Sequence, residues 1–164
     1  LLDDVGFGAS SAFGGPVNMP TAERLRDGGL SYTRFHTTAL CAPTRAALLS
    51  GRNHHSVGMG SITESATSAP GLTGVRSNTK AALAMTLKLN GYSTAQFGKC
   101  HEVPPWQTSP VGPFDAWPSG GGGFEYFYGF LAGEASQYEP TLTRNTTDTK
   151  SGWDGVVVLV LPAR

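Results

Sequence analysis

The hydrophobic and polar positions of this chain predict three short strands. Leu1 and Leu2 precede an acidic pair and indicate the end of a buried strand. Residues 30–38 alternate as strand residues do when one face is buried, which places His36 in the core or in a second layer behind it. Residues 92–98 follow a helical stretch and give the third strand.

Two short helices are predicted before residue 52. Asn18 is suited to cap the first helix, Pro20 to occupy its first turn, and the glycine pair 28–29 to end it. Pro43 suits the first turn of the second helix, because the amide hydrogen that proline lacks has no partner there. Gly51 is expected to end this helix.

A third helix, capped by Thr79 and ended by Gly91, carries its leucine and methionine side chains on or near one face. Residues 52–78 and 102–123 are predicted as loops, and the aromatic stretch 123–133 is predicted to pack in the core under a loop. The order strand, helix, strand, helix, helix, strand predicts an α/β fold, in which helices flank a mostly parallel central sheet.

The composition narrows the class of protein. The chain has 164 residues, and its 12 basic side chains balance 12 acidic ones. This balance argues against a protein that binds nucleic acid or an anionic membrane surface, and no apolar run is long enough to span a bilayer. Cys41 and Cys100 do not form a disulfide framework, and whether they bridge each other stays open.

Two acidic residues at the start of the chain are candidate metal ligands. Asp3 and Asp4 follow the first predicted strand, and in the turn after it both carboxylates can converge on one hard cation. An ordinary solvated turn is the alternative, and the pair alone does not decide between the two.

The stretch CAPTRAALLSG places Cys41 at the entrance of the second predicted helix. The positive end of the helix dipole favours negative charge there, and Arg45, one turn later, returns to the same side and can hold an anion. Cys41 is therefore a candidate nucleophile. A buried structural cysteine in front of a core helix is the alternative.

The stretch GKCHE carries a second cationic group. Lys99 and His101 flank Cys100, so at the end of a strand both would project to one face, as an oxyanion site requires. A lysine in solvent and a hydrogen-bonded histidine are the alternative. The adjacent His54 and His55 are predicted to serve the structure of their loop rather than to bind a metal.

Three motifs follow one another in this chain: DDVGFG near the start, then CAPTRAALLSG, then GKCH after the third helix. With them the chain resembles the type I sulfatases, in particular the bacterial arylsulfatase branch of the alkaline phosphatase-like superfamily. The defined positions of that family's signature, Cys-x-Pro-Ser/Thr-Arg, are all present from Cys41 to Arg45. The resemblance covers 1–138 as the N-terminal part of a catalytic domain.

The remaining residues, 139–164, are expected to be a tail outside the family pattern, either disordered or an artefact of an incomplete gene. This tail contains a strand-like apolar run from Val156 to Leu161. Cys100 stands where many family members have tryptophan, and we expect this difference to change packing rather than function.

The resemblance implies how Cys41 is used. A formylglycine-generating enzyme reads Cys-x-Pro-x-Arg on the nascent chain and oxidises the cysteine to formylglycine, whose aldehyde hydrates to two hydroxyls on one carbon. One hydroxyl attacks the sulfur of a sulfate ester, and deprotonation of the other later expels sulfate. The resemblance thus implies a sulfuric ester hydrolase of the arylsulfatase type.

The resemblance also implies a metal site. Asp3, Asp4 and the converted Cys41 would be ligands of a Ca²⁺ ion, which would activate the attacking hydroxyl and screen the developing charge. Arg45 would stabilise the hydrated aldehyde.

The third motif would supply contacts to the substrate. Lys99 and His101 would bind sulfate oxygens or the formylglycine, and His101 would also assist proton transfer.

Two alternatives stay open. A phosphonate or phosphate ester hydrolase of the same superfamily would use the same residues. The second alternative is an inactive or binding-only fragment. The resemblance implies it because type I sulfatases are much longer and take further metal ligands, a histidine and a lysine from later in the chain. The compartment is not identified, and a bacterial cytoplasm or periplasm is expected.

Overall fold

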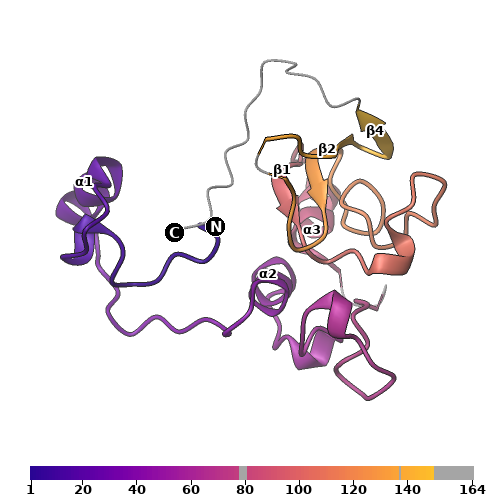
Figure 1. The fold of residues 1–164 in the computed structure, drawn as a ribbon, viewed down its shortest axis with the longest axis horizontal. Helices are drawn as coiled ribbons and strands as arrows, with labels where there is room; N and C mark the ends of the chain where they lie inside the picture. Colours follow the sequence, from indigo (N-terminus) through magenta and orange to yellow (C-terminus); the bar gives the residue numbers. More distant parts are fainter. Residues whose placement is uncertain (78–80, 137, 150–164) are drawn as a thin grey trace. The chain divides into compact units, whose positions relative to one another are not determined.

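The structure is a computed structural model that describes residues 1–77, 81–136 and 138–149 (Figure 1). The described residues form two compact units, 1–37 and 38–149. The positions of the two units relative to one another are not determined, so each unit is considered alone.

The first unit contains two helical segments, the 3-10 helix η1 (Ser11–Phe13) and the helix α1 (Pro20–Gly28). The hydroxyl of Ser10 caps η1 by accepting a hydrogen bond from the amide of Ala12 at 3.2 Å. Arg26 of α1 donates from Nη1 to the carbonyl oxygen of Ala12 at 2.7 Å, which ties the two helical segments together. Among the described hydrophobic side chains of this unit, only that of Ala12 is buried.

The boundaries of α1 agree with the sequence prediction, whereas its cap does not. Pro20 occupies the first position and Gly29 is the C-cap. The N-cap is Met19 instead of Asn18. The Met19 side chain makes no capping hydrogen bond, and the Met19 amide donates to the Ser11 hydroxyl at 2.9 Å. Since Pro20 has no amide hydrogen, one of the groups that a cap would satisfy is already missing.

The strands predicted in the first unit are absent from its described residues. Leu1 and Leu2 are exposed and lie outside any strand, and residues 30–38 run as irregular chain. His36 is exposed, so its predicted place in the core or a second layer is wrong. An alternating pattern defines two faces, but it becomes a strand only where a neighbouring strand takes up its backbone hydrogen bonds.

The second unit is an α/β structure built on a four-stranded mixed sheet (Figure 1). Its strands lie in the order β1-β2-β3-β4; β1 and β2 are parallel, and the other two pairs are antiparallel. The α/β prediction is confirmed, and in the described part the sheet is mixed rather than mostly parallel. Its helical segments are α2 (Cys41–Ser50), η2 (His55–Val57), η3 (Thr63–Ser65), α3 (Leu83–Leu89) and η4 (Pro105–Gln107), and its strands are β1 (Ala95–Cys100), β2 (Tyr126–Leu131), β3 (Leu142–Arg144) and β4 (Thr147–Thr149).

The parallel pair β1 and β2 forms one side of the sheet, with β1 as the outermost of the described strands. The register runs from Ala95 opposite Tyr126 to Cys100 opposite Leu131. Parallel strands require a long crossover, and the irregular segment 101–125 supplies it, as the loop prediction for this region expected.

Two glycines face each other across these strands. Gly98 is paired with Gly129, and a Cβ atom on Gly129 would overlap the backbone of Gly98. The close approach of the two backbones therefore requires glycine at this position.

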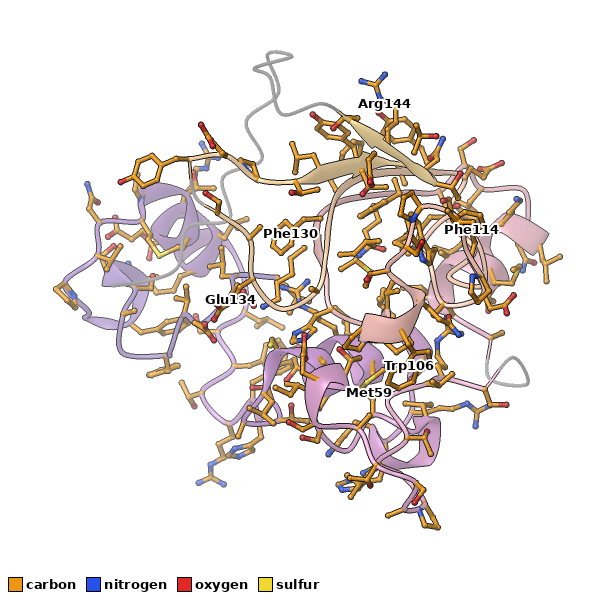
Figure 2. All side chains as sticks on the ribbon, turned by 45° about the vertical axis from the view of Figure 1, so that its right-hand side comes forward. Met59, Trp106, Phe114, Phe130, Glu134 and Arg144 are labelled. Carbon is orange, nitrogen blue, oxygen red and sulfur yellow. The ribbon has the colours of Figure 1, made fainter. Side chains whose placement is uncertain are left out.

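The core of the second unit consists of two clusters of buried side chains. The first joins Ala42 and Ala46 of α2 to Val57 and Met59. The second joins Cys100 and Phe127 of the parallel strands to Val103 and Trp117 of the crossover, with Phe114 packed against it. Figure 2 labels Met59 in the first cluster and Phe114 in the second.

The aromatic stretch 123–133 forms β2, so it lies in the core as a strand rather than under a loop. The Trp117 indole donates to the carbonyl oxygen of Gln107 and its ring meets that of Phe114 edge-on at 5.0 Å, which holds the crossover together. Trp117 shares the second cluster with Phe127, so the crossover packs against this strand.

The remaining boundaries differ from the predictions by a few residues. Helix α3 begins at Leu83 with Ala82 as its N-cap, while Thr79, the predicted cap, lies outside the described residues. The apolar run 156–161 also lies outside them. Strand β1 begins at Ala95 instead of residue 92. None of the helices in the described ranges has both the length and the apolar character needed to cross a membrane.

Candidate functional site

Helix α2 positions Cys41 as its first residue, as the sequence predicted. Ala42, Pro43 and Ala46 are buried, so one side of the helix is held in the core directly behind the thiol. Gly51 ends the helix in the left-handed conformation, also as predicted. Small side chains let the helix approach its neighbours closely, which fixes where its first turn lies.

The end of β1 lies against this first turn. His101, the residue after β1, is buried, and its Nδ1 atom lies 3.0 Å from Sγ of Cys41. Arg45, one turn into α2, donates from Nη1 to the carbonyl oxygen of Lys99 at 3.0 Å. Two motifs that are 60 residues apart in sequence are therefore joined by two contacts.

Lys99 and Cys100 are also buried at the end of β1. The Cys100 side chain belongs to the second core cluster. Since successive residues of a strand point to opposite faces, Lys99 is directed away from that cluster. Both cysteines are free thiols, so the bridge that the sequence left open is not formed.

A carboxylate that the motifs did not indicate completes this group. The Nε2 atom of His101 lies 2.7 Å from Oε2 and 3.0 Å from Oε1 of Glu64. The Thr63 hydroxyl donates to the same carboxylate at 3.2 Å. Partial burial alone would raise the pKa of Glu64, but hydrogen bonds from His101 and from the backbone outweigh it and hold the pKa below its usual value.

One sequence signal could have identified Glu64. It is the only acidic residue between Asp27 and Glu102, a segment that contains seven basic residues. These are Arg34, Arg45, Arg52, Arg76, Lys80, Lys88 and Lys99. A single carboxylate in such a basic segment is a natural partner for one of its cations, but the partner itself cannot be chosen without the fold.

Glu102, next to His101, is a second acid in this region and is half-buried. Burial raises its pKa to about 7, although the charges of Arg76 and Arg45 act in the opposite direction. Its Oε1 atom has no hydrogen-bond partner among the described residues. Burial, with the Glu102 charge adding to it, raises the pKa of Cys100 to about 12, so this thiol stays protonated and unreactive.

The predicted metal ligands fall in different units. Asp3 and Asp4 lie in a turn of the first unit, Asp4 with a φ of 54°, whereas Cys41 belongs to the second. Within 1–77, 81–136 and 138–149, no three His, Cys, Asp or Glu side chains gather as a metal cluster. The donor chemistry of two carboxylates fits Ca²⁺, which usually takes about six to eight oxygen ligands. The set Asp3, Asp4 and Cys41 stays a prediction.

The adjacent histidines of the following loop form part of a turn. His54 is the N-cap of η2, and its ring lies 4.4 Å from that of His55. The side chain of Asn53 accepts a hydrogen bond from the His55 amide at 2.9 Å. Partial burial, with the neighbouring His55 adding to it, lowers the pKa of His54. These contacts agree with the structural role expected from the sequence.

Comparisons with known proteins bear on the whole chain. Residues 1–159 match the family model described as Sulfatase, which extends beyond the 138 residues that the motifs cover. The chain is 34% identical over 160 residues to an uncharacterized sulfatase of Schizosaccharomyces pombe and 26% identical over 151 residues to an arylsulfatase of Klebsiella aerogenes. It is 33% identical over 131 residues to arylsulfatase A of Homo sapiens.

These similarities cover most of this chain but a minor part of each relative. They include 90%, 90% and 79% of the chain, and 29%, 30% and 24% of the three relatives in the same order. The chain thus spans less than a third of the length of these proteins.

Two solved structures have a similar fold. The crystal structure of Ps i-CgsB matches with a TM-score of 0.65 at 21% identity, over 90% of this chain and 35% of that one. A protein from the glycosaminoglycan metabolism of Bacteroides thetaiotaomicron matches with a TM-score of 0.67 at 24% identity, over 90% and 30%. At such identities the likeness concerns the fold, and it agrees with an alkaline phosphatase-like α/β architecture.

Proposed function

This chain belongs to the sulfatase family, and from that premise we propose that the protein hydrolyses sulfate esters with residue 41, converted to formylglycine, as its nucleophile. Since the chain spans less than a third of its relatives, the activity and the substrate of the whole protein are part of this proposal. A sulfate ester is the substrate class, and the formylglycine-generating enzyme is the partner required during maturation.

The contact between Cys41 and His101 carries the proposal. The 3.0 Å separation of Sγ and Nδ1 places a proton-accepting or proton-donating ring nitrogen directly at the residue that would be converted. A structural cysteine in front of a core helix would have no need of a buried histidine at this position. Formylglycine would supply the nucleophilic hydroxyl there.

The charges around residue 41 suit an anionic substrate. The Arg45 guanidinium donates to the backbone carbonyl oxygen of Lys99, so the Arg45 charge lies at the junction of α2 and β1, where Lys99 would add a second one. Fixed positive charges that already face the site stabilise negative charge on sulfate oxygens without reorganising during the reaction. Arg45 would act close to residue 41, and Lys99 and His101 would contact the sulfate.

The proposed calcium ligands are Asp3, Asp4 and the converted residue 41. Carboxylate oxygens are the ligands that Ca²⁺ prefers, and the ion would add positive charge beside the sulfate. The three residues are fewer than the ion usually takes, so further ligands are part of the proposal.

Mass spectrometry of the tryptic peptides tests the proposal directly. The protein is produced together with a formylglycine-generating enzyme and digested, and the peptide from Phe35 to Arg45 contains Cys41 as its only cysteine. Conversion shows as the loss of hydrogen sulfide and the gain of one oxygen. Cys100 lies in a separate peptide, from Cys100 to Arg144, and serves as the unconverted control in the same digest.

Hydrolysis of an aryl sulfate is then compared with hydrolysis of the matching phosphate and phosphonate esters. We expect conversion of Cys41 and preferential cleavage of the sulfate, both abolished by Cys41→Ala. An intact thiol at residue 41 in the presence of the maturation enzyme would refute the proposal. Preferential cleavage of the phosphate or phosphonate would assign the protein to the other chemistry of the superfamily.

A further inference from the structure

The proposed mechanism leaves one contact of the buried His101 ring unused, that with the carboxylate of Glu64. We infer that Glu64 is a positioning residue, which holds the proton of His101 on Nε2 and so leaves Nδ1 as a hydrogen-bond acceptor for the group on residue 41. The expected effect of Glu64 on catalysis rests on the proposed function, whereas the expected tautomer of the His101 ring does not.

The donors and acceptors on the two side chains decide which nitrogen of His101 carries the proton. An ionised carboxylate can only accept, and both oxygens of Glu64 lie within hydrogen-bond distance of Nε2, at 2.7 and 3.0 Å. The Nε2 atom must therefore be the donor. A neutral imidazole carries one N–H, so its other nitrogen, Nδ1, has a free lone pair and faces Sγ of Cys41 at 3.0 Å.

The ring lies inside the unit, whereas the carboxylate that meets it reaches the surface. The side chain of His101 is 3% exposed and that of Glu64 is 40% exposed, so the hydrogen bond from Nε2 joins a buried ring to a half-exposed acid. The Thr63 hydroxyl donates to Oε2 of Glu64 and orients the carboxylate in turn. Thr63, Glu64, His101 and residue 41 thus form one chain of hydrogen-bonded groups.

The position of the ring depends on a different residue. A Cβ atom on Gly133 would lie 2.8 Å from Cε1 and 3.0 Å from Nε2 of His101, so the backbone there packs directly against the ring. Packing by Gly133 therefore limits where the ring can be, while Glu64 selects which nitrogen carries the proton. Loss of the carboxylate is expected to change the tautomer without requiring the ring to leave its place.

The chemistry at residue 41 requires this tautomer. A thiol in the unconverted chain, or a hydroxyl after the proposed conversion, has one proton to donate along the direction of Nδ1. If the ring carried its proton on Nδ1, it would donate to the sulfur or oxygen of residue 41 across the 3.0 Å contact and could not accept the proton of that group. Glu64 prevents this arrangement from the far side of the ring, as second carboxylates commonly do for functional histidines.

Nuclear magnetic resonance of the full chain with ¹⁵N-labelled histidine tests the inference. The chain has four histidines, and His101→Gln assigns the signal of His101 by its disappearance. Long-range ¹H–¹⁵N correlations at about pH 8, above the usual histidine pKa, distinguish the two neutral tautomers from the doubly protonated ring. We expect the Nε2–H tautomer in the unmodified chain and in Glu64→Gln, whose amide oxygen still accepts from Nε2.

Glu64→Ala is expected to convert His101 to a mixture containing the Nδ1–H tautomer. Glu139→Ala removes an exposed carboxylate of the same unit and should leave the His101 signals unchanged. The other three histidines report whether each variant is folded. An Nδ1–H or doubly protonated His101 in the unmodified chain, or an unchanged tautomer in Glu64→Ala, would overturn the inference.

Kinetics of the converted protein give a second readout. Glu64→Ala should lower kcat by about 100-fold with little change in KM, because it disturbs proton transfer rather than substrate binding, and Glu64→Gln should retain most of kcat. An unchanged kcat in Glu64→Ala would also contradict the inference. Since the tautomer is measured on the thiol form, absence of sulfatase activity would refute the proposed function and leave the tautomer result standing.

Discussion

The first unit leaves Leu25 and Phe35 69% and 76% exposed, whereas the second unit buries Trp117 and Phe127 completely. The second unit has two clusters of buried side chains and a four-stranded sheet. The first has two short helical segments and Ala12 as the single buried hydrophobic residue among those described. A unit without a core gains little from the hydrophobic effect, so burial stabilises the described residues of the first unit much less than those of the second.

The residues of the candidate site are divided between these two units. Cys41, Arg45 and His101 are held by a core of their own unit, and their mutual contacts follow from how that core packs. Asp3 and Asp4 belong to the unit that lacks a core. Cys41 and His101 are therefore expected to keep their geometry under conditions in which the predicted carboxylate ligands do not.

The largest contrast is expected from truncating one aromatic side chain in each unit. Trp117→Ala removes a fully buried ring from the second cluster and should cost about 3–5 kcal/mol in the free energy of unfolding. Phe35→Ala removes an exposed ring and should change it by less than about 0.5 kcal/mol. Urea unfolding followed by far-ultraviolet circular dichroism measures the free energy of unfolding of both variants. A similar loss of stability in the two would show that the first unit has a core.

The second contrast concerns acidic side chains and pH. Because the pKa of Glu102 rises from 4.5 to about 7 on folding, the folded protein binds more protons than the unfolded chain within that window, and stability falls as pH rises through it. The loss from this group is at most about 3 kcal/mol. Glu102→Gln should remove this loss. Its stability relative to the unmodified chain should therefore be greater at pH near 8 than at pH near 5.

Asp27→Asn in the first unit is the matched control for this experiment. Asp27 forms an exposed ion pair with Arg26, and such pairs contribute roughly 0–1 kcal/mol. Unfolding free energies measured across the pH range should therefore be almost the same with and without this substitution. A pH dependence that persists in Glu102→Gln would show that another group causes it.

The smallest contrast is between two glycines. Gly129→Ala would place a methyl group against the backbone of Gly98 and should cost about 1–3 kcal/mol by forcing the parallel strands apart. Gly6→Ala in the first unit meets no atom within 4 Å and should be neutral or slightly stabilising. Thermal unfolding compares the two, and an equal effect of both would argue against the close approach of β1 and β2.

The local signals of the sequence predicted the elements whose ends are set by single residues. Helix α1 starts at Pro20, and α2 ends at Gly51, because proline and glycine act on the backbone of their own neighbourhood. The strand predicted over 30–38 was wrong, since its pattern contained no information about a partner strand. The aromatic stretch 123–133 was assigned to the core but not to a strand, because its pattern also gave no information about a partner strand. In the structure it contains β2.

The sequence by itself determined the family, the α/β class and the residue types of the candidate site, from Cys41 and Arg45 to His101. It could do so because each motif and each helix signal consists of residues close together in the chain. Only the tertiary structure decided that His101 meets Cys41 on one side and Glu64 on the other. Glu64 is 37 residues from its partner and belongs to no periodic pattern. Such a contact exists because α2, η3 and β1 pack together, and packing between distant segments leaves no local trace in the chain.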